Sequence, residues 1–85
     1  MTEVEMKLLL LRYNLLSKER AKIVHKCVWA RVYTSYKDEW EEYIDEMMKM
    51  EDDLRKDGYE FICTGTKAAG EVSYRVYEIV PIDHH

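Results

Sequence analysis

One predicted helix constrains this chain more than any other feature of its sequence. Between residues 36 and 57 apolar residues recur every three or four positions, a period that places them on one helical face. The apolar positions are Tyr36, Trp40, Tyr43, Ile44, Met47, Met48 or Met50, and Leu54. Acidic residues fill the opposite face. The sequence therefore predicts a long amphipathic helix that buries its apolar stripe against another element.

Both ends of this helix carry recognisable signals. Thr34 or Ser35 can cap its N-terminus with a side-chain oxygen, and Asp38 stands at the capping-box position relative to Ser35. Gly58 follows the last apolar residue, where helices commonly end on a residue in the left-handed conformation. Because these signals agree with the apolar period, we expect a helix over about 36–57.

After Gly58 the apolar period changes to two. The segments YEFIC and VSYRVYEIV are rich in aromatic and β-branched residues, and GTKAAGE separates them. This pattern predicts an antiparallel hairpin with strands at about 59–65 and 71–80. The segment GTKAAGE is expected to form the loop, and Pro81 is expected to end the second strand.

The first 34 residues allow two interpretations. The segment AKIVHKCVWARVYTS is crowded with β-branched residues, which disfavour a helix, and NLLSKER before it supplies turn residues. The favoured interpretation is an α+β fold of order β-β-α-β-β, a small antiparallel sheet backed by one long amphipathic helix. The alternative makes 2–16 and 17–32 helices, with Ser17 as an N-cap. That gives α-α-α-β-β, the order of a winged helix.

Length and composition indicate one globular domain over residues 1–85. Nearly half of the residues are apolar and 35% are charged, which excludes a disordered chain. Cys27 and Cys63 lack zinc-like spacing, and the N-terminus lacks the pattern of a signal peptide. The apolar run LLLL is too short to cross a bilayer. We expect a cytoplasmic protein without membrane contact, whose two thiols are reduced and buried.

The sheet interpretation also predicts a homodimer. Several of the predicted strands are apolar on both faces, whereas a single helix covers only one face of the sheet. A second copy, packed through a twofold interface, would cover the other face. The predicted self-association residues are Leu9, Leu11, Tyr13, Trp29, Tyr33 and Tyr77. The competing interpretation places these apolar residues in one core.

Charge is distributed unevenly along the chain, whose net charge is −4. Residues 1–37 carry eight Lys or Arg and three Glu, whereas residues 38–85 carry five Lys or Arg and fourteen Asp or Glu. An acidic helix face can recognise a basic partner by electrostatic complementarity. The candidate residues are Asp38, Glu41, Glu42, Asp45, Glu46 and Asp52. We expect a small acidic protein-binding module, an inhibitor or adaptor of the kind carried by phages and mobile elements. Its expected partner has a basic surface, and proteins that handle nucleic acid are candidates.

The alternative function is a dimeric nucleic-acid-binding regulator that uses the basic segment 18–31. Its contact residues would be Lys18, Arg20, Lys22, Lys26 and Arg31, with interleaved aromatic residues that could stack on bases. The acidic second half weighs against this function because it would repel phosphate.

Catalysis is not expected. The helix carboxylates should face solvent, and His25 with Cys27 lacks an orienting acid and an oxyanion hole. The sequence therefore predicts no enzyme, no metal site and no cofactor.

Overall fold

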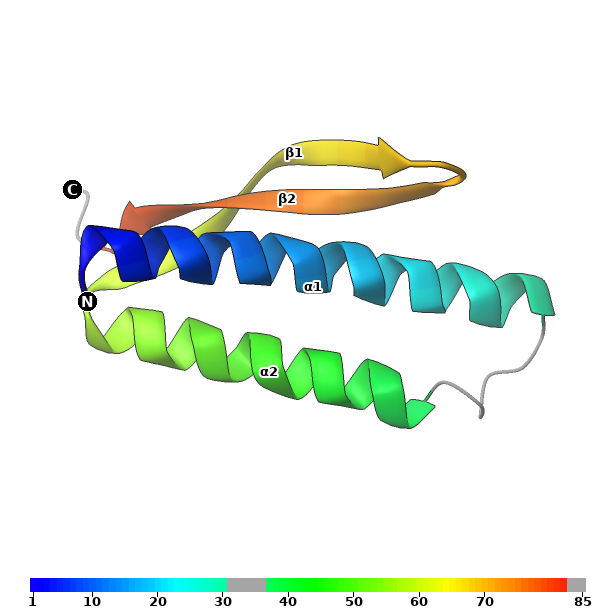
Figure 1. Cartoon of the computed structure of the whole chain (residues 1–85), viewed down its shortest axis with the longest axis horizontal. Coiled ribbons are helices and arrows are strands. Elements are labelled where there is room, and N and C mark those ends of the chain that lie inside the picture. The colour runs from blue at the N-terminus through cyan, green and yellow to red at the C-terminus, as the bar shows by residue number, and fades with distance from the viewer. Residues whose placement is uncertain (31–36, 83–85) are drawn as a thin grey trace.

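The protein is an α+β fold in which two helices precede a β-hairpin. The computed structural model describes residues 1–30 and 37–82. Along the chain it contains α1 (Glu3–Ala30), α2 (Lys37–Lys56), β1 (Tyr59–Ala69) and β2 (Val72–Pro81). Figure 1 shows α1 lying between α2, which runs antiparallel to it, and the hairpin. The predicted α+β class is confirmed, but the order β-β-α-β-β is wrong because the helices come first.

Residues 3–30 form one continuous helix, so the predicted strands there do not exist. A capping box begins the helix: Thr2 Oγ1 accepts a hydrogen bond from the Glu5 backbone N–H, and the Glu5 carboxylate accepts one from the Thr2 N–H. Leu, Glu and Lys favour helix in the first half, and β-branching costs only tenths of a kcal/mol per residue, roughly, in the second half. The alternative with helices at 2–16 and 17–32 is wrong as well, because Ser17 lies inside α1 and caps nothing.

Helix α2 confirms the prediction of an amphipathic helix at about 36–57. Met47, Met50 and Leu54 are buried on one face. At its end the Gly58 N–H donates to the Arg55 carbonyl at 2.9 Å, and Gly58 adopts a φ of 85°. This is the left-handed ending that the sequence predicts. The predicted N-terminal caps, Thr34 and Ser35, lie outside the described residues.

The hairpin is confirmed, but its strands are longer than predicted. Strand β1 continues to Ala69, so most of GTKAAGE is strand and the turn is confined to 70–71. Gly70 has a φ of 66°, which suits the first central residue of a two-residue hairpin turn. The register shifts between Cys63 and Gly65, leaving Thr64 as a bulge. Strand β2 ends at Pro81, as predicted.

The core lies where α1, α2 and the hairpin meet. Tyr13, Leu16, Met47 and Met50 are buried there, and Leu9, Tyr43, Phe61 and Tyr77 pack against them. The Tyr13 ring stacks on Phe61 with centroids 3.8 Å apart and meets Tyr77 edge-on at 4.9 Å. The Tyr13 hydroxyl donates to Glu51 Oε1 at 2.9 Å. Burial, together with this acidic neighbour, raises the pKa of Tyr13.

Polar side chains of α1 bind the outer edge of β2. Asn14 Oδ1 accepts from the Tyr77 N–H at 2.8 Å, and Asn14 Nδ2 donates to the Tyr77 carbonyl at 3.2 Å. The Ser17 hydroxyl donates to the Arg75 carbonyl at 2.8 Å. These residues, which looked like turn formers in the sequence, therefore satisfy backbone groups that an edge strand would otherwise leave unpaired.

Candidate interaction surfaces

Five of the six predicted acidic residues form an exposed surface on α2. We define the acidic face as Asp38, Glu41, Glu42, Asp45 and Asp52, all of which are exposed. They point away from α1 because Met47, Met50 and Leu54 fix the opposite side of α2 in the core.

Glu46, the sixth predicted residue, is engaged within the fold. Its carboxylate accepts two hydrogen bonds from Arg12 of α1, from Nε at 2.9 Å and from Nη2 at 3.1 Å. This bidentate geometry fixes the planes of both groups. Glu46 is therefore a link between the helices and is not available on the acidic face.

Most carboxylates of the acidic face form no ion pair with a described residue of the chain, and those that do are weakly paired. Lys37 Nζ lies 3.9 Å from Glu41, and Arg55 lies 3.9 Å from Asp52. Such long, exposed pairs contribute little to stability and are easily exchanged for other partners. Within residues 1–30 and 37–82, Asp38, Glu42 and Asp45 form no ion pair. Their negative charges remain available to an external cation.

The predicted self-association residues do not share one surface. Tyr13 is buried, and Leu9 and Tyr77 pack against the same core cluster. Leu11, in contrast, is exposed on α1. Tyr33 and the side chain of Trp29 lie outside the description. Three of the six residues therefore occupy a common core. The strand face predicted for Leu9, Leu11 and Tyr13 is absent because these three residues lie in α1, whereas Tyr77 lies in β2.

A different apolar surface, which the sequence interpretation missed, lies on α1. We define the outer stripe as Val4, Leu8, Leu11 and Leu15, whose exposed fractions range from 45% to 68%. Their separations of four, three and four residues place them on one helical face. The spacing of these four residues is visible in the sequence. It is obscured by the run LLLL, which places apolar residues on both the buried and the exposed face of the helix.

The predicted basic segment is divided between two faces of α1. Lys18, Lys22 and Lys26 follow one another at steps of four, and by helical geometry they continue the line of the outer stripe. The Lys22 ammonium lies 3.4 Å from Glu19. Arg20 lies on another face of α1, where it lines a groove that α1 forms with β2, and Arg31 lies outside the described residues.

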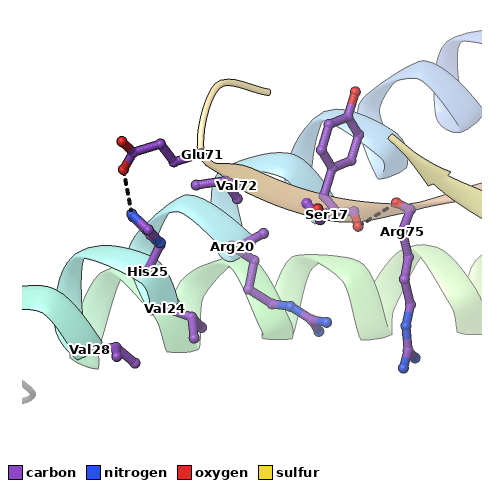
Figure 2. Close-up of a pocket in the computed structure, with 11 residues that line it drawn as sticks. Ser17, Arg20, Val24, His25, Val28, Glu71, Val72 and Arg75 are labelled. Atoms are coloured by element: carbon purple, nitrogen blue, oxygen red, sulfur yellow. Dashed lines mark hydrogen bonds and ion pairs between the residues drawn. The ribbon is translucent and has the colours of Figure 1, made fainter. Parts of the chain in front are cut away.

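A groove of about 540 Å³ separates the C-terminal half of α1 from β2. Arg20 and Val24 line it from α1, and Arg75 lines it from β2 (Figure 2). At its rim His25 Nε2 lies 3.7 Å from a Glu71 carboxylate oxygen, an ion pair when His25 is protonated. Figure 2 also shows the hydrogen bond that the Ser17 hydroxyl donates to the Arg75 carbonyl, and this bond attaches α1 to β2.

The geometry does not bring His25 and Cys27 together as a base and a nucleophile. Residues two apart on a helix point in different directions. Cys27 is half-buried, and Cys63 is exposed, so the expectation that both thiols are buried is wrong for Cys63. Among the described residues, no group of three His, Cys, Asp or Glu side chains lies close enough to hold a metal ion.

Neither helix, over its described length, is long and apolar enough to cross a membrane. Comparisons with protein-family models, with curated proteins and with solved structures found no match. The surfaces themselves are therefore the basis on which a function can be assigned.

Proposed function

We propose that the protein is a small protein-binding module, an inhibitor or adaptor, whose acidic face engages a basic surface of a partner protein. The observation that carries this proposal is the set of five exposed carboxylates on the side of α2 that faces away from the core. In this proposal the protein acts in the cytoplasm on a partner with a cationic groove, and nucleic-acid-handling proteins fit that description.

The spacing of these carboxylates supports recognition of an extended basic surface. From Asp38 to Asp52 the face extends over about 21 Å of helix, with a carboxylate on most turns. Because Met47, Met50 and Leu54 anchor α2, the charges project from a rigid element. A surface that is predominantly negative, with Lys49 as its one base between Asp38 and Asp52, accelerates encounter with a complementary partner and disfavours partners of negative charge.

The proposal is tested by affinity purification followed by a binding measurement on the captured partner. Glu42→Lys with Asp45→Lys should weaken binding by about tenfold or more, because favourable charge contacts become repulsive. The matched control is Glu71→Lys with Glu78→Lys, which changes the net charge equally on the exposed hairpin. The control should bind like the wild-type chain.

Salt dependence supplies the second readout. Affinity should fall between about 50 mM and about 500 mM salt, because screening weakens exposed charge contacts. Three results would refute the proposal: unchanged affinity across this range, binding that survives the acidic-face substitutions, or equal weakening by the hairpin control.

One observation supports the alternative, a nucleic-acid-binding regulator. Lys18, Lys22 and Lys26 form a row on α1, where cations one turn apart can contact phosphates. A mobility shift with DNA or RNA at low salt would favour it, provided that Lys18→Ala with Lys22→Ala removes the shift and the acidic-face substitutions do not.

A further inference from the structure

Helix α1 is apolar on two faces, and the fold covers only one of them. Tyr13, Leu16 and Ile23 are buried against the rest of the chain. The outer stripe lies on another face and remains exposed. Four aliphatic side chains in one row are unlike the scattered apolar residues of an ordinary surface, and such a row is typical of a helix with a partner on that side.

The spacing of the outer stripe is that of a coiled-coil seam. Steps of four, three and four place Leu8 and Leu15 at the a positions of a heptad, and Val4 and Leu11 at the d positions. The stripe spans about 16 Å along the helix axis. A seam of this kind accepts the equivalent seam of another helix by knobs-into-holes packing.

The surface beside the stripe is hollowed. A groove of about 550 Å³ lies between α1 and the hairpin. Leu11 and Leu15 form one wall, and Tyr74 and Val76 of β2 contribute to the other. A helix seated on the outer stripe would therefore also meet apolar side chains of the hairpin.

We propose that a second copy of this chain covers the outer stripe, with its α1 antiparallel to the first. In this twofold pairing Leu8 packs against the partner's Leu11, and Val4 packs against the partner's Leu15. The same residues serve both copies, as a twofold interface requires. The proposal does not rest on the function assigned to the acidic face.

Charge selects the antiparallel orientation. In a parallel pair Lys7 would approach the partner's Arg12, and Lys18 and Lys22 would each face their own equivalents on the seam. In the antiparallel pair Glu5 approaches the partner's Arg12 instead. Arg12 uses Nε and Nη2 to bind Glu46, which leaves Nη1 for this contact.

The lysines also fit the antiparallel register. With Leu8 opposite the partner's Leu11, position 18 lies opposite position 1, before the partner's helix begins at Glu3. Lys18 and Lys22 therefore extend past the end of the partner's α1 into solvent, where they avoid like charges and desolvation.

The acidic faces stay accessible in this dimer. Around α1, α2 is attached through Arg12, and β2 is attached through Asn14 and Ser17. By helical geometry the outer stripe occupies a third side. The dimer would present two acidic faces, one from each copy.

Mass measurement tests the dimer. Light scattering from about 1 to about 200 µM should show the mass approach twice the 10.3 kDa of one chain as concentration rises. Leu8→Glu with Leu11→Glu should raise the dimer dissociation constant by at least about 100-fold, because it places four carboxylates in the centre of the seam. Circular dichroism should show unchanged helix content in this variant.

The matched control is Met48→Glu, since Met48 is 56% exposed and belongs to α2, whereas the outer stripe belongs to α1. This variant should dimerise like the wild-type chain. A wild-type chain that stays monomeric at about 200 µM would overturn the proposal, and so would a dimer that persists in the Leu8 and Leu11 variant. If Met48→Glu dissociates the dimer as strongly as the Leu8 and Leu11 variant does, the interface does not depend specifically on the outer stripe, and the proposal is overturned.

Disulfide trapping tests the orientation. In a chain carrying Cys27→Ala and Cys63→Ala, Val4→Cys and Leu15→Cys are introduced in separate samples. In the antiparallel pair each position lies about 16 Å along the axis from its own equivalent, which exceeds the reach of a disulfide. Neither sample alone should cross-link, whereas a mixture of the two should. Cross-linking within either single sample, or none in the mixture, would overturn the antiparallel register.

Discussion

Asn14 should stabilise this fold more than an exposed polar residue on a helix usually does. Its side-chain amide makes the two hydrogen bonds that a neighbouring strand would make with Tyr77, to both the N–H and the carbonyl. The substitution Asn14→Ala removes both partners at once. It leaves two half-buried backbone groups of β2 without a protein partner.

The expected loss follows from the two orphaned groups. A hydrogen-bonding group left unsatisfied costs about 1 to 3 kcal/mol, and the lower half of that range applies because this site is only partly buried. Alanine recovers about 0.6 kcal/mol through its higher helix propensity. The free energy of unfolding should therefore fall by about 1.5 to 3.5 kcal/mol. With a urea m-value of about 1 kcal/mol/M, the unfolding midpoint should fall by about 1.5 to 3.5 M.

Urea unfolding followed by circular dichroism at fixed protein concentration measures this change. Lys7→Ala is the control, because Lys7 lies on the same helix and is exposed. It should change the free energy of unfolding by less than about 0.5 kcal/mol. Asn14→Asp keeps the acceptor for the Tyr77 N–H but places a carboxylate near the Tyr77 carbonyl, so it should also destabilise at neutral pH. If Asn14→Ala lowers the free energy of unfolding no more than Lys7→Ala does, the hydrogen bonds from Asn14 to the Tyr77 backbone do not stabilise β2.

Three further predictions concern the core, the turn and the helix pair. The pKa of Tyr13 is raised by burial and by its hydrogen bond to a carboxylate, so its contribution to stability is complete below about pH 10 and is lost as pH rises above that value. Urea midpoints at about pH 9 and about pH 11 should show a smaller alkaline loss for Tyr13→Phe than for the wild-type chain, and an equal loss would contradict this origin. Gly70→Ala should cost about 1 to 2 kcal/mol because φ is 66°, whereas Gly65→Ala should be nearly neutral because no atom lies within 4 Å of the added Cβ. Thermal unfolding of both variants measures the difference, and similar losses would argue against a strained turn. The Arg12–Glu46 pair is bidentate but half-exposed, so a double-mutant cycle should give a coupling below about 1 kcal/mol that shrinks with salt. A coupling above about 2 kcal/mol would show that the pair is better shielded from water than its exposure indicates.

The parts of the fold that were predictable from sequence are those specified by local signals. For α2, the apolar period and Gly58 independently indicate the same element. For the hairpin, alternation of β-branched and aromatic residues is strong on both sides of the turn. The misplaced loop has a local cause, because Gly65 and the alanines of GTKAA have low strand propensity but pair with β2 nonetheless.

Helix α1 was not predicted because two of its polar residues serve contacts with a strand far away in the sequence. Asn14 and Ser17 resemble turn residues until β2 is in place, and the Asn14–Tyr77 bonds join positions 63 residues apart. The capping box of Thr2 and Glu5, in contrast, was readable from the sequence. This local signal favours a helix from the first residues, and tertiary packing readily exceeds the helix penalty of the β-branched residues in the second half.

The uneven charge along the sequence produces two separate surfaces because the chain folds back on itself. The Arg12–Glu46 and His25–Glu71 pairs join the basic N-terminal half to the acidic C-terminal half. The side chains that these contacts do not use lie on two separate surfaces. Carboxylates lie on the outer side of α2, and aliphatic side chains followed by lysines lie on the outer side of α1.

These two surfaces project from different helices, and substitutions in the outer stripe leave the acidic face unchanged. A dimer formed through the stripe would double the number of acidic faces without altering any one of them. The proposed self-association and the proposed partner binding can therefore be tested independently, and a partner with two basic sites would gain from both through its higher effective concentration at the second site.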